Sequence, residues 1–229
     1  MDKSDSVDED LQWAFFELHF TAPRLRHYLT ECGGNTERAI QLYMWDTDLS
    51  SAFWESLGHL EIALRNTIDR QMTLRQTNKS RSTSWIYDDA RELGRDKRAP
   101  GRHEYPFVDV DIAKKRVQKN AMPLDPGQII SELSFGFWHQ MVSKRQRFLW
   151  PDLAAAFPHM PGRNQIIVSD LVGSLRGFRN RLAHHHRIWS LDPTGRYQEL
   201  QLLAGFIDPD LARWIDENSR VTGLLSQRP

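Results

Sequence analysis

The chain of 229 residues is long enough for one large domain or two small ones. Its composition, with 40% hydrophobic and 26% charged residues, is typical of a globular protein with a buried core. Thirty basic and thirty acidic side chains give a formal net charge of zero. This balance excludes nucleic-acid binding through a general positive field, so any such binding must come from a local cluster of basic residues.

Cysteine usage and the N-terminal sequence exclude further classes of protein. Cys32 is the single cysteine, which excludes an internal disulfide and a cysteine-based zinc site. The first residues, MDKSDSVDEDL, are acidic and polar, unlike the apolar stretch of a secretory signal. Because no window approaches the roughly 20 apolar residues that span a bilayer, we expect a cytoplasmic protein with no membrane partner.

Helical patterns dominate the N-terminal part of the chain. Residues 6–20 begin with a serine and acidic side chains, which suit a helix N-terminus, and then place apolar residues on one face. Residues 21–35 predict a helix that starts at a proline and ends at two glycines. A third helix is predicted over 35–48.

A long core helix is predicted next. From about Leu49 to Arg75 there is no proline, and apolar residues recur with the spacing of one helix face. Residues 76–108 differ because they are polar and rich in arginine. We predict a loop there, with a short helix around Trp85 to Leu93.

The second half of the chain returns to helical spacing. No stretch of useful length alternates with the period of two that marks a strand, so we predict an all-α fold. We expect one domain over 1–229, with N-terminal helices in 1–48 and a helical bundle in 49–229. Within the bundle, helices are predicted over 109–122, 126–143, 147–157, 163 to about 186, 196–207 and 208–225.

The stretch LRGFRNRLAHHHRIW, residues 175–189, combines four arginines and three consecutive histidines with no acidic residue. On a helix that starts at Arg163, an apolar stripe of Leu171, Leu175, Phe178 and Leu182 faces the core. Asn180 and His184 then lie on the opposite side as i and i+4 neighbours. Arg179 lies on the flank, so its long side chain or a looser helix end is needed to bring it and His184 to one phosphate.

Two glycines fall on the same outer face as Asn180 and His184. Gly173 and Gly177 are one turn apart, and each glycine inside a helix costs roughly 1 kcal/mol relative to alanine. A smooth strip of this kind suits the close approach of another backbone. We therefore predict that Gly173 and Gly177 face a partner copy in a homodimer, in which two copies of His184 meet in one cleft.

The sequence RNRLAHH at 179–185 resembles the Arg-Asn-x3-His signature of the HEPN superfamily, in the form seen in Abi-like proteins of bacterial abortive-infection systems. LEIALRN at 60–66 is similar to the Glu-x3-Arg-Asn segment of the same family. Further similar blocks follow in the family's order along most of the chain. The resemblance implies a HEPN-like helical bundle that dimerises, with additional N-terminal and C-terminal helices.

For active members, the resemblance implies metal-independent endoribonuclease chemistry without a cofactor. The resemblance implies that Arg179 and His184, at the matching positions of the family's signature, are the catalytic pair and that Asn180 supports them. RNA carries its own nucleophile, the 2′-hydroxyl, so the enzyme need only move its proton and stabilise the charge on phosphorus. Histidine, with a pKa of roughly 6.5, suits the proton transfer, and the arginine fork suits the phosphate oxygens.

Two features of the sequence allow more than one interpretation. Glu61 and Arg65 are either an intrahelical salt bridge worth a few tenths of a kcal/mol or a supporting polar network in which Glu61 orients Arg179 or Arg65. The run of histidines at 184–186 suggests a metal, but successive helical residues point 100° apart and do not share one ion without unwinding. We predict no metal there and assign no role to His185 or His186.

Three functions are compatible with these patterns. The first is an endoribonuclease of an abortive-infection or toxin–antitoxin type system for phage defence, with RNA as substrate and an antitoxin or regulatory protein as partner. The second is a catalytically inactive HEPN module that binds RNA or a partner protein. The third is a structural dimerisation domain. The intact RNRLAHH favours the enzyme, because an inactive copy is free to lose the arginine or the histidine.

Overall fold

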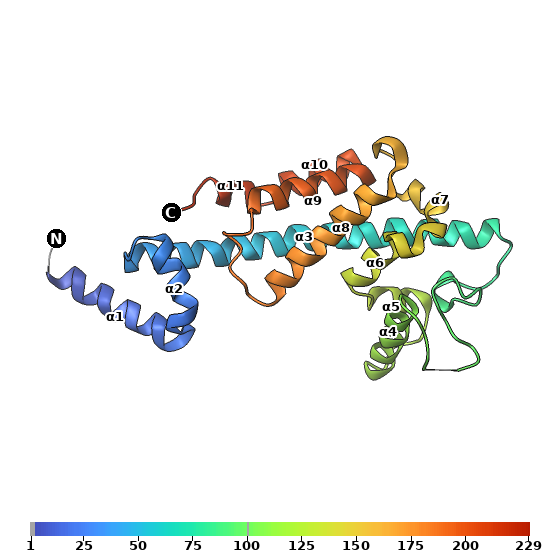
Figure 1. Cartoon of the computed structure of the whole chain (residues 1–229), viewed down its shortest axis with the longest axis horizontal. Helices are drawn as coiled ribbons and strands as arrows, with labels where there is room; N and C mark the ends of the chain where they lie inside the picture. The colour runs from blue at the N-terminus through green and yellow to red at the C-terminus, as the bar shows by residue number, and fades with distance from the viewer. Residues whose placement is uncertain (1–2, 100) are drawn as a thin grey trace. The chain divides into compact units, whose positions relative to one another are not determined.

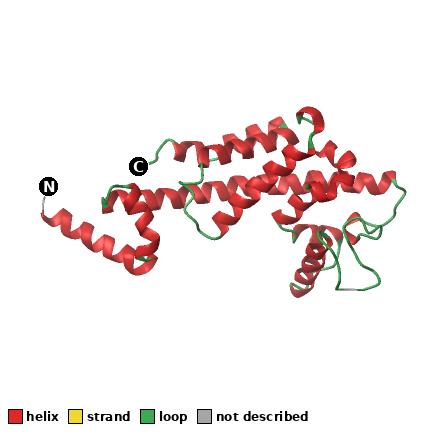
Figure 2. Ribbon diagram, viewed as in Figure 1, coloured by secondary structure: helices red, strands yellow, loops and turns green. Residues whose placement is uncertain are grey.

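The computed structural model describes residues 3–99 and 101–229. These residues form helices, turns and loops, and no strand is present among them (Figure 2). The predicted all-α class is therefore confirmed. None of the helices in this part of the chain is both long and apolar enough to cross a bilayer.

The helices of the described residues follow one another with mostly short connections (Figure 1). Four short 3-10 segments accompany them: η1 (Trp85–Tyr87), η2 (Lys144–Leu149), η3 (Ala154–Ala156) and η4 (Pro161–Arg163). The α-helices are α1 (Lys3–Phe20), α2 (Ala22–Glu31), α3 (Thr36–Asn78), α4 (Phe107–Lys119), α5 (Pro126–Ser131), α6 (Phe135–Val142), α7 (Trp150–Leu153), α8 (Gln165–Ala183), α9 (Pro193–Ile207), α10 (Pro209–Glu217) and α11 (Val221–Leu225).

Helix α3 is longer than the sequence pattern predicts. The helices expected over 35–48 and from Leu49 to Arg75 are one helix of 43 residues (Figure 1). The polar stretch near residue 46 does not interrupt it. Asp46 is buried there and accepts a hydrogen bond from the hydroxyl of Tyr28 at 2.8 Å. The partner of Asp46 lies on another helix, so local spacing does not predict this hydrogen bond.

Two predicted helices are divided in the structure. The stretch 126–143 forms α5 and α6, because Ser134 between them is extended, with φ −80° and ψ 163°. The stretch 208–225 forms α10 and α11, and the hydroxyl of Ser219 before α11 accepts the backbone N–H of Val221 at 3.2 Å. In both cases a serine lies in the break between the two helices, where the apolar spacing alone looks continuous.

The described residues group into two compact units. Unit 1 contains those of Met1–Ser56, Arg181–Tyr197 and Asn218–Pro229, and unit 2 those of Leu57–Asn180 and Gln198–Glu217. Helices α3, α8 and α9 each contribute residues to both units. The boundary in α3 lies at Ser56, near the expected junction between 48 and 49, while the single domain over 1–229 stays a prediction.

Each unit has its own buried side chains. In unit 1, Phe16 of α1, Leu25 of α2 and Ile40 of α3 form one hydrophobic cluster. In unit 2, α3 buries a stripe of residues with helical spacing, and α6 and α8 bury theirs as well. The residues of that α3 stripe are Leu57, Leu60, Leu64, Ile68 and Met72.

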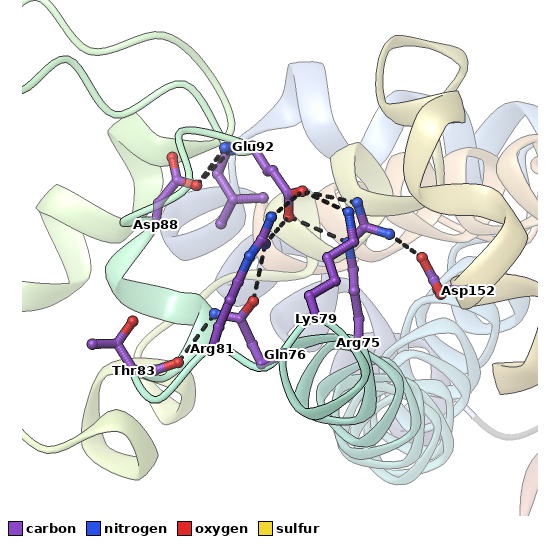
Figure 3. A network of polar contacts seen from close by, with 9 residues as sticks. Arg75, Gln76, Lys79, Arg81, Thr83, Asp88, Glu92 and Asp152 are labelled. Carbon is purple, nitrogen blue, oxygen red and sulfur yellow. Dashed lines mark hydrogen bonds and ion pairs between the residues drawn. The ribbon is translucent and has the colours of Figure 1, made fainter.

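A network of ion pairs holds the loop after α3 against the end of that helix, within unit 2 (Figure 3). Glu92 in the loop accepts hydrogen bonds from Arg75 of α3 at 2.8 Å and from Arg81 at 3.0 Å. Arg75 also pairs with Asp152 of α7. Between α3 and α4 the described residues contain only the short helix η1, so most of the predicted loop is indeed irregular.

Candidate functional site

Helices α3 and α8 bring together Glu61, Arg65 and Arg179 in unit 2. Glu61 and Arg65 are one turn apart on α3, beside the fully buried Leu60 and Leu64. The charges of Arg179 and of Arg65 both act on the carboxylate of Glu61. The spacing of Glu61 and Arg65 predicted their proximity to each other, whereas the proximity of Arg179 to Glu61 was one of two interpretations that the sequence left open.

Glu61 is anchored from a third helix as well. The backbone N–H of Phe135, at the start of α6, donates a hydrogen bond to its carboxylate. Burial raises the pKa of Glu61, while Arg179, Arg65 and the Phe135 N–H partly oppose that rise. A partly buried carboxylate with two cationic neighbours and a backbone donor is held in place, which an exposed intrahelical pair is not.

Helix α8 ends earlier than the predicted position near residue 186. Its last residue is Ala183, and His185 has a left-handed backbone with φ 52°. The N–H of His185 bonds to the carbonyl of Leu182 at 2.9 Å, and the N–H of His186 bonds to that of Arg181 at 3.0 Å. This pair of bonds is a Schellman motif, which satisfies the last carbonyls of a helix and ends it.

The motif places the three histidines in the turn after α8. His184, His185 and His186 are all exposed, and the rings of His184 and His186 are perpendicular with centroids 6.3 Å apart. In the part of the chain that the structure describes, no three histidine, cysteine or acidic side chains are grouped to hold a metal ion. Asn180 is exposed in the last turn of α8.

Asp46 fixes the chain that follows these histidines. Its Oδ1 accepts the backbone N–H groups of Ile188 and Trp189, each at 3.0 Å, and its Oδ2 accepts the hydroxyl of Tyr28. Burial raises the pKa of Asp46, although these three hydrogen bonds favour its charged form. Sequence reasoning missed this residue. The available signal was an acidic residue at the spacing of the apolar stripe of α3, between Leu42 and Leu49.

The two glycines of α8 have different surroundings. A Cβ atom on Gly173 would lie 2.9 Å from Nε2 of His139 of α6, so a larger residue there would require the imidazole of the same chain to move. A Cβ atom on Gly177 would meet nothing within 4 Å, and Gly177 is exposed. Of the two predicted dimer-facing glycines, Gly177 is therefore the one for which no contact within the described part of the chain explains the absence of a side chain.

The apolar stripe of α8 is close to the predicted one. Leu175, Phe178 and Leu182 are buried, whereas Leu171 is only half-buried. His139 of α6 lies between this helix and the rest of unit 2, against Gly173. Burial and the charge of Arg176 lower the pKa of His139, although a hydrogen bond with the backbone of Ser169 and the charge of Asp170 oppose this.

The family model for Abi-like proteins matches residues 12–190. This range covers most of the chain and includes Glu61, Arg65 and the whole RNRLAHH stretch. Comparisons with curated proteins and with solved structures give no significant match.

Proposed function

This chain belongs to the Abi-like protein family, which relates it to abortive infection, and from that membership we propose that it is a metal-independent endoribonuclease of an abortive-infection or toxin–antitoxin type system. We place it in the HEPN superfamily on the strength of RNRLAHH. In this proposal the enzyme acts on RNA in the cytoplasm as a homodimer, and an antitoxin or regulatory protein restrains it.

The observation that carries this proposal is that the charge of Arg179 acts on the partly buried carboxylate of Glu61. It links the arginine of RNRLAHH on α8 to the glutamate of LEIALRN on α3, 118 positions apart in the sequence. An arginine whose only role is to solubilise a helix face needs no partly buried carboxylate from another helix. Pre-positioning of a charged group is what phosphoryl transfer requires, because a fixed charge costs no reorganisation during the reaction.

The proposed reaction is an internal transesterification. His184 removes the proton from the 2′-hydroxyl, whose oxygen attacks the adjacent phosphorus, and the bond from phosphorus to the 5′-oxygen breaks. Arg179 donates to the non-bridging oxygens as their charge grows. The leaving 5′-oxygen takes up a proton from a second His184, supplied by the partner copy in the dimer. The products are a 2′,3′-cyclic phosphate and a 5′-hydroxyl, so the reaction consumes no water.

Incubation of the purified protein with total RNA tests the proposal directly. We expect cleavage that persists in EDTA and leaves 2′,3′-cyclic phosphate ends. Arg179→Ala and His184→Ala should each lower the rate by at least about a hundredfold, because general acid–base catalysis and charge stabilisation contribute roughly this much. Arg181→Ala, at an exposed arginine of the same helix, is the matched control and should keep activity.

The outcomes separate the candidate functions. Undiminished cleavage by His184→Ala refutes the assigned chemistry. Retention of RNA without cleavage, unchanged by His184→Ala, favours the catalytically inactive module. Arg179→Ala must remain folded for the comparison, which circular dichroism and thermal unfolding check.

A further inference from the structure

A cavity of about 390 Å³ lies in unit 1, between the start of α2 and the chain that follows α8. Arg24 and His27 line it from α2, and His186 and Arg187 line it from the other side. None of its described lining residues is acidic. In a chain whose net charge is zero, this is a local concentration of cationic and titratable donors around one hollow.

The walls of this cavity are held in place by contacts within unit 1. Arg24 donates from Nη2 to the carbonyl of His185 at 2.7 Å, and its guanidinium lies 5.8 Å from the ring centre of Tyr43. The left-handed backbone of His185 orients that carbonyl towards α2. Asp46 ties the backbone after Arg187 to the hydroxyl of Tyr28, which also lines the cavity. The hollow is therefore formed before any ligand arrives.

The chemistry of the lining suits a phosphate group. Arginine presents a planar fork of donors that matches phosphate oxygens, and an imidazole offers a further N–H. Arg24, His27 and His186 are exposed and Arg187 is half-buried, so a ligand can reach all four. The volume lies in the range of small-ligand sites and has room for a phosphate together with part of a sugar.

The cavity is next to the proposed catalytic histidine. His186, in its wall, lies one residue beyond His185 and has its ring 6.3 Å from that of His184. An RNA strand carries a phosphodiester at every nucleotide, so a strand whose reacting phosphate is at His184 has a neighbouring phosphate within reach of this wall. A site so close to the reacting group can position the strand without taking part in the chemistry.

We infer that this cavity binds the sugar-phosphate backbone of the RNA substrate, at a phosphodiester that flanks the one to be cleaved. The inference rests on the proposed function for its substrate, and it gives a role to His186 and Arg187, which the chemistry of Arg179 and His184 leaves unused. Binding here is through the backbone, so it selects for RNA strands and not for a base sequence.

A non-cleavable oligonucleotide separates binding from cleavage. We would titrate a fluorescent single-stranded 2′-O-methyl RNA into the full-length protein and measure anisotropy at several salt concentrations. His27→Gln and Arg187→Gln should each raise the Kd, and the double variant should raise it by roughly tenfold or more. The slope of log K against log salt should become shallower by about 0.7 for each phosphate contact that is lost.

The matched control is Arg26→Gln. Arg26 is an exposed arginine on the same helix, and it does not line the cavity. It should leave the Kd and the salt slope almost unchanged. If Arg26→Gln weakens binding as much as the cavity variants do, the binding is a general surface effect and the inference is overturned.

The imidazole NMR signals of His27 and His186 provide a second readout that needs no variant of the cavity. The oligonucleotide should shift both signals, while the signal of His59, which does not line the cavity, stays in place. Shifts with inorganic phosphate or a mononucleotide, but none with the oligonucleotide, would identify a small-anion site and overturn the RNA assignment. Unshifted signals with every ligand would overturn it too.

Failure of this inference is distinguishable from failure of the proposed function. His184→Ala should abolish cleavage and still bind the oligonucleotide with the wild-type salt slope. If RNA binds in the cavity and is never cleaved, the inference stands and the nuclease proposal fails. If RNA is cleaved through Arg179 and His184 with no contribution from the cavity, the nuclease proposal stands and the inference fails.

Discussion

Glu61 is a partly buried carboxylate that interacts electrostatically with Arg179, and we propose that it positions this arginine. Glu61→Gln keeps the shape of the side chain and removes the negative charge that faces Arg179, so we expect kcat for RNA cleavage to fall by about tenfold to a hundredfold with KM little changed. Glu55→Gln, at an exposed carboxylate of the same helix, should leave kcat unchanged. The measurement is the steady-state cleavage of a defined RNA by each variant.

The stability of Glu61→Gln separates a positioning role from a structural one. Because burial raises the pKa of Glu61, the folded state binds its proton more tightly than the unfolded state does. The contribution of Glu61 to stability is therefore complete at pH values below its pKa in the unfolded chain. It is lost as the pH rises through its pKa in the folded protein. We expect the glutamine variant to unfold at no lower urea concentration than the wild type at neutral pH. A large loss of stability would indicate that Glu61 serves the fold.

Asp46, in contrast to Glu61, stabilises the fold of unit 1 and has no part in the proposed chemistry. Asp46→Ala leaves two backbone N–H groups and the hydroxyl of Tyr28 without their acceptor, which should lower the free energy of unfolding by about 2–4 kcal/mol. Asp46→Asn keeps an acceptor for both N–H groups and should cost much less. Equal losses in the two variants, measured by urea unfolding, would contradict this account.

At the scale of elements, the ion pairs around Glu92 attach the loop to α3. Burial alone would raise its pKa, but hydrogen bonds and charges from Arg75 and Arg81 lower the pKa of Glu92 from 4.5 to about 2. The ion pairs of Glu92 therefore stabilise the fold at pH values above the pKa of Glu92 in the unfolded chain. That contribution is lost as the pH falls from about 4.5 towards 2. The difference between these two pKa values corresponds to about 3 kcal/mol at neutral pH.

Glu92→Gln should lose most of that stabilisation at pH 7 and should show a flatter dependence of stability on pH in this acid range. Trypsin should also cut the loop between α3 and α4 faster. The control is Glu104→Gln, whose pair with Arg145 is exposed on both sides and should be worth less than about 1 kcal/mol. Urea unfolding at several pH values compares the two, and an equal change in both variants would contradict the prediction.

At the scale of the whole molecule, the proposed homodimer depends on the outer face of α8. Gly177 is exposed with open space at its Cβ position, so Gly177→Arg fits the isolated chain and obstructs a partner backbone. We expect light scattering to give about 54 kDa for the wild type, twice the 26.8 kDa of one chain, and the monomer mass for the variant. Cleavage of RNA should fall together with the dimer.

Gly223→Arg is the control, because Gly223 of α11 is equally exposed and open. It should leave the mass unchanged. A wild-type monomer that cleaves RNA at full rate would remove the need for two copies of His184. Monomerisation by both arginine variants would indicate a general effect of added charge.

Several features of this protein follow from local sequence. The apolar spacing along α3 and α8 indicated helices and their buried stripes, because a helix of 3.6 residues per turn repeats its core face whatever it packs against. The polar composition after residue 76 indicated irregular structure. The motifs RNRLAHH and LEIALRN indicated the Abi-like family, which the match over residues 12–190 establishes. These properties depend on residues that are near one another in the chain.

Local spacing was insufficient wherever a contact joins distant parts of the chain. The hydrogen bond between Tyr28 and Asp46 joins α2 to α3, and Arg24 of α2 donates to the carbonyl of His185 in the turn that ends α8. A Cβ atom at Gly173 would crowd the imidazole of His139 of α6, a contact within the chain that spacing does not show, and the dimer-facing role of Gly173 stays a prediction.

The amino-acid sequence by itself determined the helical class, the family and the residues able to carry acid–base and phosphate chemistry. Tertiary structure alone decided which of them act on one another: Arg179 on Glu61 in unit 2, and Arg24 and His27 around a cavity with His186 in unit 1. The reason is physical. Helix periodicity is a property of neighbouring residues, whereas electrostatic contact and concave surfaces arise only when separate helices pack.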